Sequence, residues 1–174
     1  MLTVKSAFFD GELSVVPYKD KSGKVIKGVY AHEEEHSLFG RLLLNGKEYD
    51  YSFDVIPGYI GNFASSPDIW LVQKIVPSYV KGDNVYNSGF DAHDWLYSRE
   101  GVCNSGEVLT RSEVDDFARG VMRESATIKR GWGARIRCSI MDVSVGLFAG
   151  NKRHWGNDTF KSKPYAHFWL KEVK

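Results

Sequence analysis

Residues 38–56 read LFGRLLLNGKEYDYSFDVI, and this stretch decides the first part of the fold. Two segments rich in apolar and aromatic residues, Leu38–Leu44 and Glu48–Ile56, flank the dipeptide Asn45-Gly46. Asn-Gly is a strong signal for a two-residue turn between antiparallel strands, because both residues tolerate the positive φ angles that this turn requires. The stretch therefore predicts a β-hairpin.

The same pattern occurs nearer the N-terminus. Leu2–Phe9 and Leu13–Tyr18 flank Asp10-Gly11, so we expect a first hairpin there. Ser22-Gly23 marks a further turn, and Pro57-Gly58 ends the last strand because proline has no N–H to donate to a ladder. Residues 1–60 are therefore expected to be mainly β.

Helix signals dominate the rest of the chain. Thr110 and Glu113 form a capping box, in which each side chain accepts a hydrogen bond from the other residue's backbone N–H. Ser66 followed by Pro67 is typical of a helix start, and Gly101 is expected to stop the helix before it. The expected helices cover residues 66–76, 85–99, 110–125 and 129–148, and residues 165–173 are expected to return as a strand.

These elements predict an α+β fold, with an antiparallel N-terminal sheet followed by a helical C-terminal half that contains a packed antiparallel helix pair. We expect a single domain over residues 1–174, mainly β over 1–60 and mainly helical over 61–150, with a C-terminal extension over 151–174. At 43% hydrophobic residues, 174 residues can bury a core without a metal or disulfide.

Composition excludes several classes of function. The net charge of +1 gives no general reason to expect a nucleic-acid partner. The start, MLTVKSAFFDGEL, carries an acid at position 10 and does not resemble a signal peptide. No window approaches 18 uninterrupted apolar residues, so we expect no membrane span, and any membrane contact would be peripheral. Cys103 and Cys138 lack metal-ligand spacing and are expected to be two reduced thiols or one disulfide.

The candidate site lies on the helices expected over 85–99 and 110–125. Tyr86, Phe90, His93 and Tyr97 recur on one helical face, so His93 and Tyr97 are neighbours one turn apart. A connection of about ten residues lets the next helix pack antiparallel, which brings Asp115 within reach of both.

This grouping has a chemical use and a structural alternative. A histidine beside a buried carboxylate is held in one tautomer and can take a proton near neutral pH. Tyr97 can fix the Asp115 carboxylate, and Asp94, rotated about 100° from His93, is free to hold a divalent cation. The same four residues could equally brace two helices without any catalysis.

Longer motifs resemble a phage and prophage protein family of unknown function. The matching stretches are Val55-Ile56-Pro57-Gly58-Tyr59, Phe63-Ala64-Ser65-Ser66-Pro67 with Trp70, His93-Asp94-Trp95-Leu96-Tyr97, and Val114-Asp115 with Met122. They span roughly residues 50–155. Asn62 stands where that family usually has aspartate, which weakens any catalytic or ligand role there.

The sequence His-Asp-x-x-Tyr, with an aspartate 22 residues after the histidine, is similar to the compact phospholipases A2. The resemblance implies that His93 activates a water, Asp94 binds calcium, and Tyr97 and Asp115 support the histidine. Backbone carbonyls of Gly58, Gly61 and Asn62 would complete the calcium site, although this loop lies about thirty residues upstream, further than the family places it.

His32-Glu33-Glu34-Glu35-His36 matches the H-E-x-x-H pattern of zinc peptidases, in which two histidines one helical turn apart bind zinc. The surrounding residues indicate strand and turn instead of helix, and no third ligand follows at the expected spacing. We therefore favour a solvated acidic loop over a zinc peptidase here.

A basic and aromatic region near the C-terminus could contact phosphate, lipid headgroups or a partner protein, or could simply be the polar face of the helix expected over 129–148. It contains Arg130, Trp132, Arg135, Arg137, Lys152, Arg153, His154 and Trp155.

The leading hypothesis is a phage-encoded protein with a hydrolase site that acts on a lipid or another ester, with calcium as the expected cofactor or with no cofactor at all. The alternative is a non-enzymatic virion component, associated with tail or capsid, whose exposed aromatics bind a neighbouring subunit. The expected partners are other phage structural proteins or peripheral lipid, and the expected location is the host cytoplasm or the assembled virion.

Overall fold

The computed structural model describes residues 1–61, 80–129, 161 and 163–174, together with Trp132, Ile136, Ser139, Trp155 and Gly156. The helix expected over 66–76 lies outside these residues, as does most of the helix expected over 129–148.

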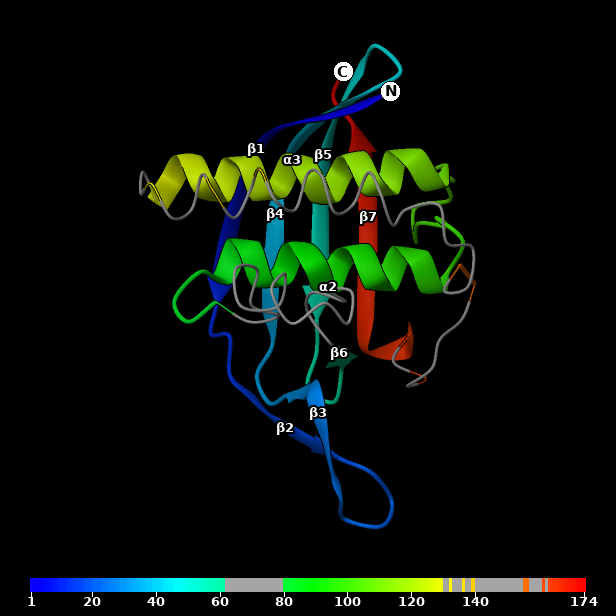
Figure 1. Ribbon diagram of the computed structural model, residues 1–174. Helices are drawn as coiled ribbons and strands as arrows, with labels where there is room; N and C mark the ends of the chain where they lie inside the picture. The colour runs from blue at the N-terminus through cyan, green and yellow to red at the C-terminus, as the bar shows by residue number, and fades with distance from the viewer. Residues whose placement is uncertain are drawn as a thin grey trace.

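A four-stranded antiparallel sheet, in the order β1-β4-β5-β7, forms the centre of the fold (Figure 1). Its strands are β1 (Leu2–Gly11), β4 (His36–Leu44), β5 (Lys47–Val55) and β7 (Ala166–Glu172). The hairpin of β4 and β5 is confirmed, and its turn residues Asn45 and Gly46 have φ angles of 52° and 85°. The expected C-terminal strand is confirmed as β7, which pairs with β5.

The first expected hairpin is wrong. β1 does not turn at Asp10-Gly11 but continues through it and pairs with β4, with Gly11 opposite His36. A side chain at position 11 would collide with the backbone of Glu35 and His36, so this glycine serves a close approach of two strands. Burial of Leu2, Val4 and Ala7 along a ten-residue strand outweighs the local preference of two residues for a turn.

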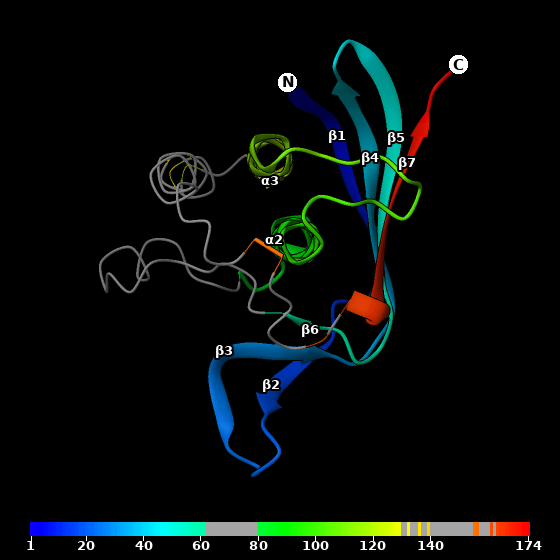
Figure 2. The same ribbon diagram turned by 90° about the vertical axis from the view of Figure 1, so that its right-hand side faces the viewer.

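The segment after β1 instead belongs to a second, smaller sheet. β2 (Val15–Lys19) pairs with β3 (Val25–His32), and β3 pairs with the short β6 (Ile60–Gly61). The expected turn at Ser22-Gly23 connects β2 and β3. This second sheet lies at one end of the four-stranded sheet (Figures 1 and 2).

Two helices, α2 (Asn84–Ser98) and α3 (Arg111–Lys129), cover one face of the four-stranded sheet (Figure 2). They run antiparallel, as contacts at both ends show. Ser125 near the end of α3 donates to Asp83 at the start of α2 over 2.7 Å, and Tyr97 near the end of α2 donates to Asp115 near the start of α3 over 2.6 Å. The capping box is confirmed, because Thr110 N donates to Glu113 Oε2 over 2.9 Å and Glu113 N donates to Thr110 Oγ1 over 3.3 Å.

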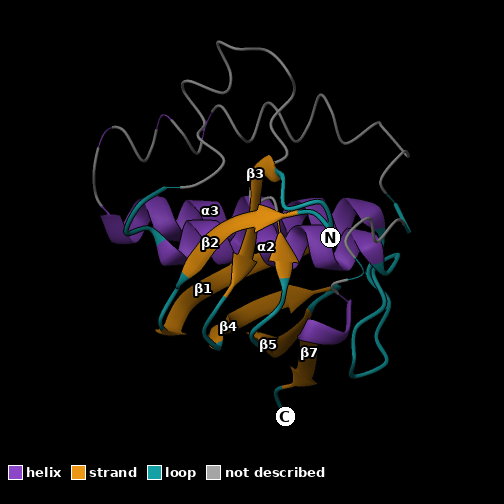
Figure 3. Ribbon diagram, turned by 90° about the horizontal axis from the view of Figure 1, so that it is seen from below, coloured by secondary structure: helices purple, strands orange, loops and turns teal. Residues whose placement is uncertain are grey.

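The core lies between this helix pair and the sheet. Along β5 the side chains alternate, with Tyr49, Tyr51, Phe53 and Val55 turned inward, as a strand period of two requires. Seen from below, α2 and α3 lie across one face of the strands and leave the other face uncovered by either helix (Figure 3). The α+β class, the N-terminal sheet and the packed helix pair are therefore confirmed.

Within the described residues, no helix is both long enough and apolar enough to span a membrane.

Candidate functional site

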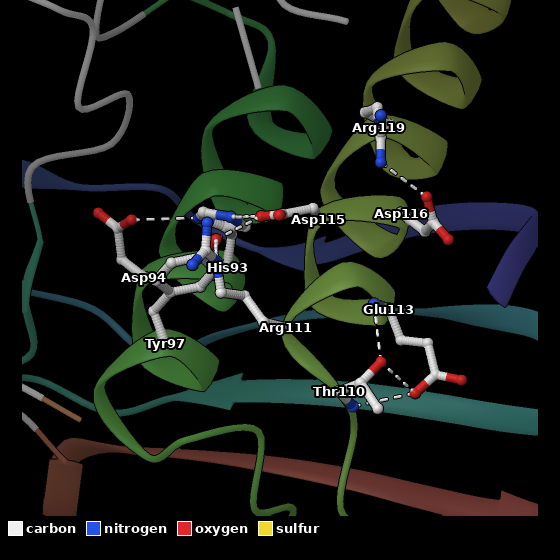
Figure 4. Close-up of polar contacts among 9 residues, drawn as sticks. All are labelled: His93, Asp94, Tyr97, Thr110, Arg111, Glu113, Asp115, Asp116 and Arg119. Atoms are coloured by element: carbon white, nitrogen blue, oxygen red, sulfur yellow. Dashed lines mark hydrogen bonds and ion pairs between the residues drawn. The ribbon is translucent and has the colours of Figure 1, made fainter. Parts of the chain in front are cut away.

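The four residues singled out on the two helices do come together (Figure 4). His93 Nε2 lies 3.0 Å from Asp115 Oδ1, and His93 Nδ1 lies 3.3 Å from Asp94 Oδ1. The Tyr97 hydroxyl donates to the same Asp115 oxygen over 2.6 Å. One carboxylate oxygen of α3 is therefore shared by two side chains of α2.

Local structure explains this geometry. The buried face of α2 carries Tyr86, Phe90 and Tyr97, and it turns His93 toward α3. The capping box fixes the first turn of α3, and Asp115 lies one turn further on. Arg111 in that first turn donates through Nε to the Tyr97 hydroxyl over 3.3 Å. The hydroxyl thus accepts from a cation and donates to an anion.

The environment of His93 favours its charged form. Burial by itself lowers the pKa of His93, but the hydrogen bonds to Asp115 and Asp94 and the negative charges of both carboxylates outweigh burial and raise this pKa to about 9. The protonated ring donates from both nitrogens. Burial also raises the pKa of Tyr97 far above its ordinary value, and the bond to Asp115 adds to the shift. Tyr97 therefore remains a hydroxyl donor.

Exposure differs among the members of this cluster. The side chain of Asp115 is 5% exposed and that of His93 is 15% exposed, whereas Asp94 reaches 26%. The Nδ1 side of His93 is therefore the side nearer to solvent, and Asp94 is the group that occupies it.

The glycine loop expected to complete a calcium site contacts His32 and Asp91. Gly58 N donates to the His32 carbonyl over 2.9 Å, and a Cβ on Gly61 would overlap Oδ1 of Asp91. Asn62 lies outside the described residues. Calcium binds six to eight oxygen ligands, but Asp94 belongs to no group of three His, Cys, Asp or Glu side chains within the described chain. Among the described residues, Asp94 therefore has no cluster of further acidic side chains that would complete a calcium shell.

A second polar cluster was missed by the sequence interpretation. His32 ends β3, His36 begins β4, and Asp91 lies on α2; they are 2%, 4% and 0% exposed. His32 Nε2 lies 3.2 Å from Asp91 Oδ2, and the two imidazole rings have centroids 5.0 Å apart. Glu33, Glu34 and Glu35 between the histidines are exposed.

This arrangement corrects the interpretation of His32–His36 in two ways. The expected acidic loop exists, but its two flanking histidines are buried, not solvated. The helical geometry of an H-E-x-x-H zinc peptidase is absent because the residues form strand, turn and strand; Glu33 points to Ser14, whose hydroxyl donates to it over 3.0 Å. The sequence signal for this cluster was a pair of histidines at the ends of two strands joined by a tight turn. Nothing in the sequence distinguished Asp91 from the other acidic residues of the helices.

In the second cluster, the pKa of His36 shifts in the direction opposite to that of His93. Burial and the nearby His32 lower the pKa of His36 to about 3. Burial raises the pKa of Asp91 to about 6, although His32 opposes the shift. His36 is therefore a neutral imidazole at ordinary pH.

The cysteines and the basic and aromatic region were also singled out in the sequence. Cys103 is a buried free thiol, while Cys138 lies outside the described residues. In the basic and aromatic region, Trp132 is 81% exposed and Trp155 packs edge-on against Tyr97 with ring centroids 5.0 Å apart. The basic residues of that region lie outside the described residues.

No family model matches the chain, and neither a curated protein nor a solved structure matches it at a significant level.

Proposed function

We propose that His93, Asp94, Tyr97 and Asp115 form the acid–base site of a phage-encoded hydrolase that cleaves esters, with lipid esters as the first class to test. The observation that carries the proposal is the shared oxygen of Asp115, which accepts from both His93 Nε2 and the Tyr97 hydroxyl. A carboxylate fixed by a second donor holds an imidazole in one orientation and one tautomer. Nδ1 is then the nitrogen that can act as the general base.

The chemistry follows from that tautomer. When His93 loses its Nδ1 proton, Nε2–H stays bonded to Asp115, and the Nδ1 lone pair can take a proton from a water molecule. The water oxygen then bonds to the ester carbonyl carbon, and the carbon–oxygen bond to the alcohol breaks. Nδ1 returns its proton to the departing alkoxide.

In this proposal, Asp94 raises the pKa of His93 and does not contact the substrate. Its carboxylate lies against Nδ1 and contributes to a His93 pKa of about 9, so the free base is the minor form at neutral pH. Hydrolysis should therefore increase with pH up to about 9. The proposal assigns calcium no step, since the described residues gather no further ligand group around Asp94.

The test is an initial-rate assay with p-nitrophenyl esters and with phosphatidylcholine or phosphatidylglycerol vesicles, with calcium and with a chelator. His93→Gln should lower kcat/KM by about 100-fold or more, the usual contribution of a general base. His167→Gln is the matched control, because His167 lies in β7, away from the cluster, and bonds to Asn104. Asp94→Asn should move the apparent pKa of the rate profile downward. Equal rates for wild type and His93→Gln would refute the proposal.

A second candidate, a non-enzymatic virion component, is favoured by a different observation. Phe8, Phe39, Ser52 and Trp169 lie in one row across the open face of the sheet, opposite one another in register. The three aromatic side chains are 54%, 39% and 45% exposed, which is unusual for an uncovered surface. Such a row suits contact with a neighbouring protein subunit.

The charges beside this row favour a second copy of the chain as the neighbour. Asp10 and Asp54 lie on one side, and Arg41 and Lys171 lie on the other together with Asp50. A two-fold axis along the row would place the acidic side of one copy against the more basic side of the other. Sedimentation of wild type against Phe39→Ser should detect loss of a dimer. A wild-type monomer at all concentrations would contradict this candidate.

A further inference from the structure

We propose that His32, His36 and Asp91 bind one divalent transition-metal ion, with zinc as the preferred metal, and that this ion links the two sheets to α2. This site is separate from the His93 cluster and does not depend on the proposed hydrolase activity. It also differs from a zinc peptidase, because no helix carries the histidines and Glu33 lies outside the cluster.

The donor atoms are already close together. One ligand atom from each residue can be chosen so that all three lie within 4.8 Å of one another. Zinc binds imidazole nitrogen and carboxylate oxygen at about 2 Å, so tetrahedral ligands are about 3.3 Å apart. His32 Nε2 and Asp91 Oδ2 are already at 3.2 Å. The His36 nitrogen, which lies within 4.8 Å of the other ligand atoms, would move closer to them to complete a tetrahedral set.

The second observation is the lack of hydrogen bonds at two of these buried side chains. Among the described residues, no hydrogen bond of normal geometry reaches either ring nitrogen of His36 or Oδ1 of Asp91. The same side chains are 4% and 0% exposed, so water gives little compensation. Oδ2 of Asp91 lies against His32, but Oδ1 of Asp91 and the His36 ring are buried without such a hydrogen bond, which is unfavourable unless a ligand satisfies them. A metal ion satisfies both at once.

The surrounding structure holds Asp91 in place for this role. The Tyr59 hydroxyl donates to the Asp91 carbonyl over 3.0 Å, and the Tyr59 ring packs edge-on against His32 at 5.3 Å between centroids. Gly61 leaves the space that the Asp91 carboxylate fills, because any Cβ at this position would overlap Oδ1. These contacts orient the ligands in the way that a metal site requires.

The donor set also indicates the class of metal. Two imidazoles and one carboxylate are typical of zinc and neighbouring transition metals, whereas calcium and magnesium prefer oxygen ligands alone. Three protein ligands leave a fourth position for water or another group. The ion would join the end of β3 and the start of β4 to the middle of α2, which lies more than fifty residues further along the chain.

The experiment uses the tag-free full chain, stripped with a chelator. Titration with Co²⁺ should give the visible absorption of a four-coordinate site at one ion per chain, and Zn²⁺ should displace it, while Ca²⁺ and Mg²⁺ should not. His36→Gln and Asp91→Asn should each weaken binding by about 100-fold or more. His93→Gln and His167→Gln are the matched controls and should bind as wild type does.

Three results would overturn the site: no Co²⁺ absorption in wild type, binding that survives both His36→Gln and Asp91→Asn, or binding lost only in a control variant. If either site variant fails to fold, imidazole ¹⁵N shifts of the wild type decide the matter. Zinc should move the resonances of His32 and His36 and leave His167 unchanged; the reverse pattern, or no shift, refutes the proposal.

Discussion

Two histidine clusters on the same helix have opposite ratios of imidazole to carboxylate. Around His93, one ring faces two carboxylates, Asp94 and Asp115. Around Asp91, one carboxylate faces two rings, His32 and His36. Excess negative charge raises the pKa of His93 to about 9, whereas burial and a second ring lower that of His36 to about 3.

This difference explains why similar residues suit different tasks. A protonated ring between two anions is satisfied by hydrogen bonds, and it can release a proton only when the surrounding charge or pH changes. A neutral buried ring offers a lone pair, which is what a metal ion requires. The first cluster therefore suits proton transfer or bracing, and the second suits a metal. The following measurements test that contrast.

The largest expected effect is that of Asp115→Asn. It leaves a protonated His93 without its closest anion and replaces the charged acceptor of Tyr97 by a neutral amide oxygen, so the free energy of unfolding should fall by about 3–5 kcal/mol in urea titrations. Asp116→Asn is the matched control: its carboxylate bonds to Arg119 at the surface, and its loss should cost less than about 1 kcal/mol. Equal losses in the two variants would show that the Asp115 carboxylate contributes no more to stability than that of Asp116.

The second effect is a dependence of stability on pH. Because the folded-state pKa of His93 lies above its ordinary 6.5, its stabilising contribution is complete below pH 6.5 and disappears as pH rises through about 9. A shift of this size corresponds to up to about 3 kcal/mol. Urea unfolding from pH 6 to 10 should show this loss in wild type and in His167→Gln, and a flatter profile in His93→Gln. Identical profiles in all three would show that His93 is not charged.

Third, zinc should stabilise the chain. A ligand that binds only the folded state adds about 2.7 kcal/mol at a free concentration 100 times its Kd. The urea midpoint should therefore rise with zinc for wild type and for His93→Gln. Asp91→Asn should remove the rise, since it takes away the only carboxylate of the proposed set. A rise retained in Asp91→Asn would mean that zinc binds elsewhere.

The smallest effect belongs to Tyr97→Phe. It removes one hydroxyl donor from Asp115 and one acceptor from Arg111, with little change in ring packing, so we expect a loss of about 1–2 kcal/mol by urea unfolding. Tyr165→Phe, at a ring that is 40% exposed, should change stability by less than about 0.5 kcal/mol. A loss as large as that of Asp115→Asn would show that Tyr97, not His93, is the main partner of Asp115.

Much of the fold was predictable because its signals are local. The turn at Asn45-Gly46, the capping box at Thr110 and the end of α2 before Gly101 each depend on a few neighbouring backbone angles and hydrogen bonds. Asp10-Gly11 shows the limit of such signals, since the pairing of β1 with β4 depends on residues about thirty positions away.

The sequence by itself determined the His93 cluster, because helical periodicity places His93 and Tyr97 on one face and the capping box sets where α3 begins. The other cluster was decided only by tertiary structure. Asp91 becomes a partner of His32 and His36 because α2 packs where the two sheets meet, and because Gly61 leaves room for its carboxylate. Local spacing can align groups on one helix; only packing can bring strands and a helix to one point.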